Sequence, residues 1–183
     1  HTYFYNMNPT NWKIDPAHSE VKFKVKHLVI STVSGHFNQF DATTESNKDD
    51  FSDAKISFSA DIDSISTGNE QRDGHLKSAD FFDAAAHPKL SFVSSAIVCK
   101  GGSDFEVTGD LTIRGTTKPV TLEVDFGGTH GDFYGNTVAG FELNGKINRQ
   151  AFGLTWSAVT EAGGIVVSDD VKLHMNVELH KKG

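Results

Sequence analysis

The stretch AKISFSADIDSI, residues 54–65, alternates apolar with polar side chains from Ala54 through Asp63. Successive side chains of a β-strand point to opposite faces, so this period of two predicts a strand with one apolar and one hydrated face. Such alternation is typical of antiparallel sheets, which cover one face and expose the other. The stretch therefore predicts an antiparallel β-protein.

The same period of two recurs on both sides of this stretch, most clearly in VKFKVKH, residues 21–27. Roughly eight strands separated by glycine-bearing turns favour an antiparallel barrel or a sandwich. The expected strands are 21–27, 30–42, 54–65, 89–100, 104–115, 120–128, 137–149 and 168–182. Eight strands closed into a barrel leave room for side chains or for one small ligand, whereas a sandwich packs its inner faces together and leaves no lumen.

Several of these segments depart from a plain strand pattern. Gly35 lies inside the expected strand 30–42, where glycine often marks a bulge or a sharp bend. Residues 42–53 are polar and predict a turn. In the strand 89–100, Val93, Ile97 and Cys99 interrupt the apolar alternation. We therefore expect both faces of that strand to be partly covered, with the cysteine as a small packed side chain.

The stretch SISTGNEQRDGHLKSADFFDAAAHPKLSF, residues 64–92, begins unlike a strand and predicts a short helix. Thr67 and Glu70 have the spacing of a capping box, in which each side chain accepts from the other residue's backbone N–H. Leu76, Ala79 and Phe82 follow at helical spacing. The helix is expected to be short because Gly74 lies in its interior.

Two adjacent phenylalanines, Phe81 and Phe82, follow this helix before the turn at His87 and Pro88. A connection that carries two large apolar rings needs something apolar to cover. The two rings either close the bottom of an ordinary core or line and gate a cavity.

Size and composition restrict the class of protein. The 183 residues and 19.9 kDa suit one domain, expected at 12–183 after an N-terminal tail at 1–11. A net charge of −7 argues against a nucleic-acid partner. We find neither a leader nor the roughly 18 consecutive apolar residues of a membrane span. Met7 as the natural start would indicate a cytoplasmic protein, and removal of a leader a periplasmic one.

Candidate chemistry is sparse in this sequence. The nine histidines form no HxxxH or HxH pair, and His174 and His180 lie about 20 Å apart along one expected strand, so no metal site is predicted. A GxSxG turn is also missing. Arg72, Asp73 and His75 form the densest ionisable cluster. They are the one group worth testing for catalysis, unless Arg72 and Asp73 simply pin the helix to the barrel rim.

Five segments together resemble the YceI-like family of lipocalin-like, polyisoprenoid-binding proteins. They are WKIDPAHSEVKFKVKHL at 12–28, STGNEQRDGHLKSADFFD at 66–83, HPKLSF at 87–92, GDLTIRGTTKPV at 109–120 and INRQAFGLTW at 147–156. The resemblance implies an all-β fold, an eight-stranded antiparallel lipocalin-like barrel with a short helical insertion. It also implies a lumen that binds a long isoprenoid-type lipid, such as a polyprenyl chain or an isoprenoid quinone, and it adds no catalytic residue.

A non-catalytic carrier or store for such a lipid is the function we expect, because a phenylalanine-rich lining suits an apolar chain. No cofactor beyond this ligand is expected, and a homodimer is possible. The expected ligand-binding residues are Phe23, Val25, Ile56, Phe58, Ile62, Leu76, Phe81, Phe82, Phe92, Leu111, Ile113, Leu122, Val124, Phe141, Leu143, Trp156, Leu173 and Met175. Arg72 and His75 are the candidates for the lipid head group. The alternatives are an enzyme that acts on the lipid through the rim cluster and a β-sandwich module that binds carbohydrate or protein.

Overall fold

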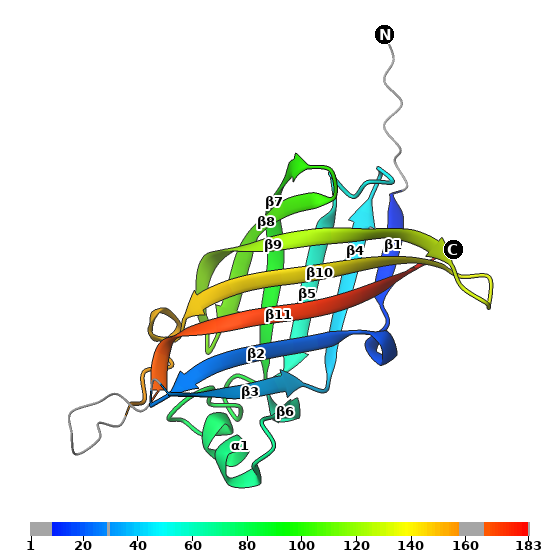
Figure 1. Cartoon of the computed structure of the whole chain (residues 1–183). Helices are drawn as coiled ribbons and strands as arrows, with labels where there is room; N and C mark the ends of the chain where they lie inside the picture. The colour runs from blue at the N-terminus through cyan, green and yellow to red at the C-terminus, as the bar shows by residue number, and fades with distance from the viewer. Residues whose placement is uncertain (1–8, 29, 158–166, 183) are drawn as a thin grey trace.

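The protein is a closed antiparallel β-barrel with one short helix at an end (Figure 1). The computed structural model describes residues 9–28, 30–157 and 167–182. Hydrogen-bonded neighbours follow the order β1-β4-β5-β7-β8-β9-β10-β11, and β11 pairs with β1 to complete the ring. The predicted eight-stranded barrel is confirmed, and a sandwich is excluded because this ring has no free edge.

The elements follow one another along the chain with short connections. They are β1 (Thr10–Ile14), η1 (Pro16–His18), β2 (Glu20–His27), β3 (Ser31–Phe37), β4 (Phe40–Ser46), β5 (Lys55–Asp61), η2 (Ile62–Ser64), β6 (Ile65–Ser66), α1 (Glu70–Lys77), β7 (Lys89–Gly101), β8 (Asp104–Ile113), β9 (Thr116–Gly131), β10 (Thr137–Asn148), η3 (Arg149–Phe152) and β11 (Val167–Lys181).

Three barrel strands are interrupted, which is why eleven strands lie in the described residues where eight were expected. The expected strand 54–65 was wrong as a single element, because the chain turns at Ile62 and splits it into β5, η2 and β6. One edge of β11 pairs with β2 through Val167–Asn176 and with β1 through Leu179–Lys181, so β1 and β2 form one interrupted stave. The expected strand 30–42 was wrong as a single element: it splits into β3 and β4, and β4 continues to Ser46 inside the expected turn. β1 begins at Thr10, whereas residues 1–8, which include Met7, lie outside the described residues.

A β-bulge accounts for the blurred alternation of β7. Ser94 pairs with Gly109 and Ala96 with Thr108, which leaves Ser95 as an extra residue. The extra residue reverses the facing of the rest of the strand, so Phe92 and Ile97 both point inward although they are five residues apart. Val93 lies on the outer face and is exposed. Cys99 is exposed as well, so the expectation of a packed cysteine was wrong.

Gly35 does not mark a bulge, and that expectation was also wrong. β2 and β3 stay in register through the pair Phe23 and Gly35. A side chain at position 35 would place its Cβ 2.3 Å from Cζ of Phe23. The glycine is needed because the phenylalanine ring lies flat across the neighbouring strand.

Helix α1 forms where the sequence predicts it, but with a different cap. Asn69 is the N-cap, and its side chain accepts from the Arg72 N–H at 2.9 Å. The Thr67 hydroxyl and backbone N–H instead donate to Asp73, at 2.5 and 2.9 Å. The predicted capping box of Thr67 and Glu70 was therefore wrong, because Asp73 lies one turn further into the helix and takes both donors.

Candidate ligand-binding cavity

The barrel interior contains a cavity of about 240 Å³ whose wall is almost entirely apolar. Inward side chains from every stave contribute to it, as the alternation along each strand requires. Among the described lining residues, only Lys22, Thr44 and Arg149 carry polar side chains. The interior is therefore suited to an apolar molecule.

Sixteen of the eighteen expected ligand-binding residues lie on this wall. They are Phe23, Val25, Ile56, Phe58, Leu76, Phe81, Phe82, Phe92, Leu111, Ile113, Leu122, Val124, Phe141, Leu143, Leu173 and Met175. The period-two pattern identified the thirteen strand residues, because inward positions of a closed barrel face one common space. Leu76, Phe81 and Phe82 were expected instead from the helical segment and the two phenylalanines that follow it.

Ile62 and Trp156 are not on the wall. Ile62 continues the apolar alternation of β5 in the sequence, but the chain turns into η2 there and buries the side chain in the surrounding core, at 2% exposure. Trp156 packs edge-on against His75, with ring centroids 4.7 Å apart, and lies 5.4 Å from the ring of Phe81. It packs against the helical segment and the surrounding core instead.

One end of the cavity is closed by Phe51, which comes from the β4–β5 connection opposite α1 (Figure 1). The ring is 3% exposed and packs against Phe126 and Phe141, with centroids 5.2 and 5.0 Å away, and against Trp12 at 5.1 Å. The backbone of Phe51 has φ of +62°, a left-handed conformation that non-glycine residues seldom adopt. This conformation turns the ring into the barrel.

The other end is covered by α1 and the residues that come directly after it. Leu76, Phe81 and Phe82 all reach the cavity wall, and the ring of Phe82 lies edge-on to Phe37 with centroids 6.4 Å apart. Arg114 holds the segment by donating to the Phe81 carbonyl at 2.8 Å. The adjacent phenylalanines therefore pack in the core and also line the cavity, so the two interpretations of the sequence do not exclude each other.

The rim cluster of Arg72, Asp73 and His75 does not line the cavity. Arg72 donates to the hydroxyl and carbonyl oxygens of Thr67 at 2.8 and 2.7 Å, and Asp73 accepts from the same threonine. His75 pairs with Asp80 at 2.9 Å. Arg72 and Asp73 hold the start of the helix, and neither Arg72 nor His75 lines the cavity. Their contact with a head group stays a prediction.

Arg149 is a buried cation on the cavity wall, and it was not among the expected site residues. Its guanidinium, 3% exposed, donates to the carbonyls of Leu154, Trp156 and Val167 at 2.6, 2.7 and 3.2 Å, and to the Ser168 carbonyl at 2.9 Å. Burial lowers the pKa of Arg149, although the nearby Asp169 acts in the opposite direction. With its donors committed, Arg149 fastens the chain on both sides of residues 157–166.

Twenty further residues complete the wall. They are Ile14, Val21, Lys22, Phe37, Ala42, Thr44, Phe51, Ala54, Leu90, Ile97, Phe105, Val107, Val120, Ile147, Arg149, Leu154, Val167, Val171, Val177 and Leu179. Most continue an inward alternation visible in the sequence, so the same signal would have found them. Phe51 and Arg149 are exceptions, because a loop and a 3-10 turn bring them to the wall.

Comparison with models of protein families identifies the family of this chain. The model of the YceI-like domain matches residues 12–179. The chain belongs to the YceI-like family. A UPF0312 protein of Staphylococcus aureus strain USA300 is 39% identical to this YceI-like chain over 170 residues, which cover 92% of the chain and 96% of that relative.

Solved structures have the same YceI-like barrel. BcnA of Burkholderia cenocepacia superposes with a TM-score of 0.78 at 26% identity, covering 90% of this chain and 98% of that one. The YceI protein of Campylobacter jejuni gives 0.73 at 33% identity over the whole of both chains. A polyisoprenoid-binding domain of Saccharophagus degradans gives 0.67 at 13% identity, covering 93% of this chain and 98% of that one, and this likeness shows the fold alone.

The recognition made from five sequence segments is thereby confirmed. In the part of the YceI-like chain that the structure describes, no helix has the length and apolar character needed to cross a membrane. The possible homodimer stays a prediction, although Val93 and Val98 on the outer face of β7 are each 53% exposed.

Proposed function

We propose that this protein binds a long isoprenoid-type lipid, a polyprenyl chain or an isoprenoid quinone, in the barrel cavity without transforming it. The observation that carries the proposal is the apolar wall, on which sixteen expected residues meet. Transfer of an apolar chain from water to such a wall is favourable by about 25 cal/mol per Å² buried and makes no directional demand. The Saccharophagus degradans domain with the same fold is a polyisoprenoid-binding domain, which supports this ligand class.

A transport or storage role fits this wall better than catalysis. General acid–base chemistry needs ionisable groups within hydrogen-bond reach of the substrate. The described wall offers Lys22, which is exposed and pairs with Glu20 at 2.9 Å. It also offers Arg149, which donates to four backbone carbonyls, and Thr44, which is buried on β4. The alternative rim cluster is engaged with Thr67 and Asp80, outside the cavity. These contacts support a binding protein.

Organic extraction tests the proposal directly. The protein is purified under mild conditions from its native host, and the extract is analysed by mass spectrometry beside a control protein of similar size. We expect a polyprenyl or quinone species in stoichiometric amount. A clean extract, repeated after incubation of the protein with a polyprenol and an isoprenoid quinone, would contradict the proposal and return attention to Arg72, Asp73 and His75.

Phe58→Asp should abolish lipid binding, because Phe58 faces the cavity and a charge there opposes an apolar ligand. Val93→Asp is the matched control, because Val93 lies on the outer face of the neighbouring strand β7 and is 53% exposed. Co-purified lipid is measured in both variants, with far-UV circular dichroism as the check on folding.

Phe58→Asp has the drawback that it can unfold the barrel, so a second variant keeps the test decisive. Val25→Trp stays apolar and fills part of the cavity, at an overpacking cost of about 1–3 kcal/mol. We expect this folded variant to lose most of its lipid. Full lipid content in folded Val25→Trp would show that the ligand lies elsewhere.

A further inference from the structure

A second site lies outside the barrel, where β1 and β11 close the ring. Val177 and Leu179 of β11 line the cavity, so Glu178 and His180, which alternate with them, point outward. Asp15 follows β1 directly, and its N–H donates to the Glu178 carbonyl at 2.8 Å. Residues from the two ends of the chain thus meet on one outer patch.

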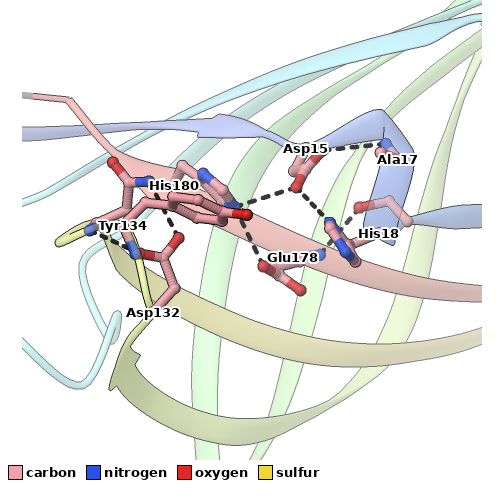
Figure 2. Close-up of polar contacts among 9 residues, drawn as sticks. Asp15, Ala17, His18, Asp132, Tyr134, Glu178 and His180 are labelled. Atoms are coloured by element: carbon pink, nitrogen blue, oxygen red, sulfur yellow. Dashed lines mark hydrogen bonds and ion pairs between the residues drawn. The ribbon is translucent and has the colours of Figure 1, made fainter.

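Three potential metal ligands converge on this patch (Figure 2). Nε2 of His180 lies 3.2 Å from Oδ2 of Asp15 and 3.1 Å from Oε1 of Glu178. One ligand atom from each of the three residues lies within 4.8 Å of the other two. Two ligands about 2.0–2.1 Å from a tetrahedral metal ion stand roughly 3.3 Å apart, so the observed separations are close to the edges of such a site.

The surrounding contacts hold these ligands in place. Oδ1 of Asp15 accepts from the Ala17 N–H at 3.0 Å, and Oδ2 faces Nδ1 of His18 at 2.7 Å. The Glu178 N–H donates to the hydroxyl of buried Ser19 at 3.0 Å. Backbone and side-chain partners of this kind orient the ligands of metal sites and raise their affinity.

We propose that Asp15, Glu178 and His180 bind one divalent transition-metal ion of the zinc type, with His18 positioning Asp15. One imidazole and two carboxylates favour such an ion over Mg²⁺ and Ca²⁺, which prefer oxygen ligands alone. The three side chains are each less than a third exposed, at 17%, 31% and 28%, which leaves a solvent-facing side for a water ligand. The ion would join β1 to β11 at the closure of the barrel.

No short sequence motif predicts this site, because its ligands come from both ends of the chain. Asp15 and Glu178 are far apart along the chain, and the antiparallel pairing of β1 with β11 brings them together. The expectation that the histidines form no metal site is replaced by a proposal that uses one histidine and two carboxylates.

Zinc titration of the full chain, followed by isothermal calorimetry near neutral pH, tests the proposal. We expect one Zn²⁺ per chain at this site, and an affinity that falls by more than about tenfold in His180→Ala, since loss of even an outer-shell partner costs that much. His174→Ala is the matched control, because His174 lies on the same face of β11 and bonds Asn144 instead. Zinc should also raise the melting temperature of wild type and His174→Ala, but not of His180→Ala.

Glu178→Gln serves as a second variant that keeps the size of the side chain and removes one anionic ligand. It should also weaken zinc binding more than about tenfold. Equal zinc affinity in wild type, His180→Ala and Glu178→Gln would overturn the site, as would a wild-type affinity for Ca²⁺ equal to that for Zn²⁺. These readouts do not depend on whether a lipid occupies the cavity.

Discussion

At the scale of single residues, Phe51 shows how a side chain in a loop can complete a barrel. Its segment is polar, SNKDDFSD at 46–53, and the sequence predicts a turn there. The prediction placed the chain correctly near a turn and missed the ring, because no periodicity operates in a loop. The left-handed backbone and three surrounding aromatic rings fix the ring inside the barrel.

Phe51→Ala should lower the free energy of unfolding by about 3–5 kcal/mol, because it leaves a hole among packed aromatic rings. Urea denaturation measures the change. Phe133→Ala is the control, since Phe133 is fully exposed in the β9–β10 connection, and it should stay within about 0.5 kcal/mol of wild type. A loss below about 1 kcal/mol in Phe51→Ala would contradict the closure described for this end.

Glycines show the same limit of sequence reasoning at another position. A Cβ at Gly109 would lie 2.5 Å from Cζ of Phe92 and 2.5 Å from the Val93 carbonyl oxygen. Glycine inside a strand signals a special environment, but the sequence does not say whether that is a bulge or a covering ring. The structure has both here, because Gly109 also pairs with Ser94 at the bulge of β7.

At the scale of elements, the β4–β5 connection is held by one carboxylate. Asp53 accepts from the Ser46 hydroxyl and the Asn47 N–H, each at 2.9 Å, and from the Lys48 N–H at 3.1 Å. Burial raises the pKa of Asp53, but these hydrogen bonds outweigh it and hold the pKa below the ordinary 3.8. The same connection carries Phe51, so the carboxylate supports the closed end of the cavity.

Acid should therefore destabilise the wild type through Asp53. Because the folded-state pKa lies below the unfolded value of 3.8, the contribution is complete above pH 3.8 and is lost as pH falls through the folded pKa. We expect Asp53→Asn to be less stable than wild type at pH 7, with the difference shrinking below pH 3.8. Urea denaturation at a series of pH values measures it.

Asp63→Asn is the control for this pH series, because Asp63 is exposed in η2. Its stability should follow the wild type across the series. A gap between wild type and Asp53→Asn that stays constant down to the lowest pH would refute the assigned role of the carboxylate.

Alternation along the strands made most of the elements and most of the wall predictable. Where an extra residue enters, as at Ser95, the pattern fails locally because the facing of the next residues is reversed. The break within residues 30–42 was also not predicted, because apolar residues continue through it while β3 ends and β4 begins. Arg149 was missed because its partners are carbonyl groups, which every residue carries.

At the scale of the whole molecule, the ring is closed by contacts between the two ends of the chain. Trp12 pairs with Lys181 and Ile14 with Leu179, and no local pattern predicts such a pairing. The count of roughly eight strands and the choice between an antiparallel barrel and a sandwich were predictable from the period of two and the turns. The family resemblance added the closure and the ligand class, of which the structure and the comparisons confirm the closed barrel.

A ligand in the cavity should stabilise the whole barrel, because every barrel strand contributes side chains to the cavity wall. At a ligand concentration a hundredfold above Kd, the gain is about 2.7 kcal/mol. For a domain of this size that corresponds to a rise in Tm of roughly 5–10 °C. Calorimetry of delipidated protein with and without added polyprenol measures it, with Phe58→Asp as the variant that should not respond. An unchanged Tm in wild type would count against binding in the cavity.

The aromatic ring of Phe51 closes one end of the barrel cavity. A cavity closed at this end has a fixed depth, so the proposed linear lipid, with its tail toward Phe51, would stop where its last methyl groups meet that ring. The barrel would then select ligands by their number of repeating units rather than by their chemical groups. Removal of the Phe51 ring would then shift the preference toward ligands with more repeating units.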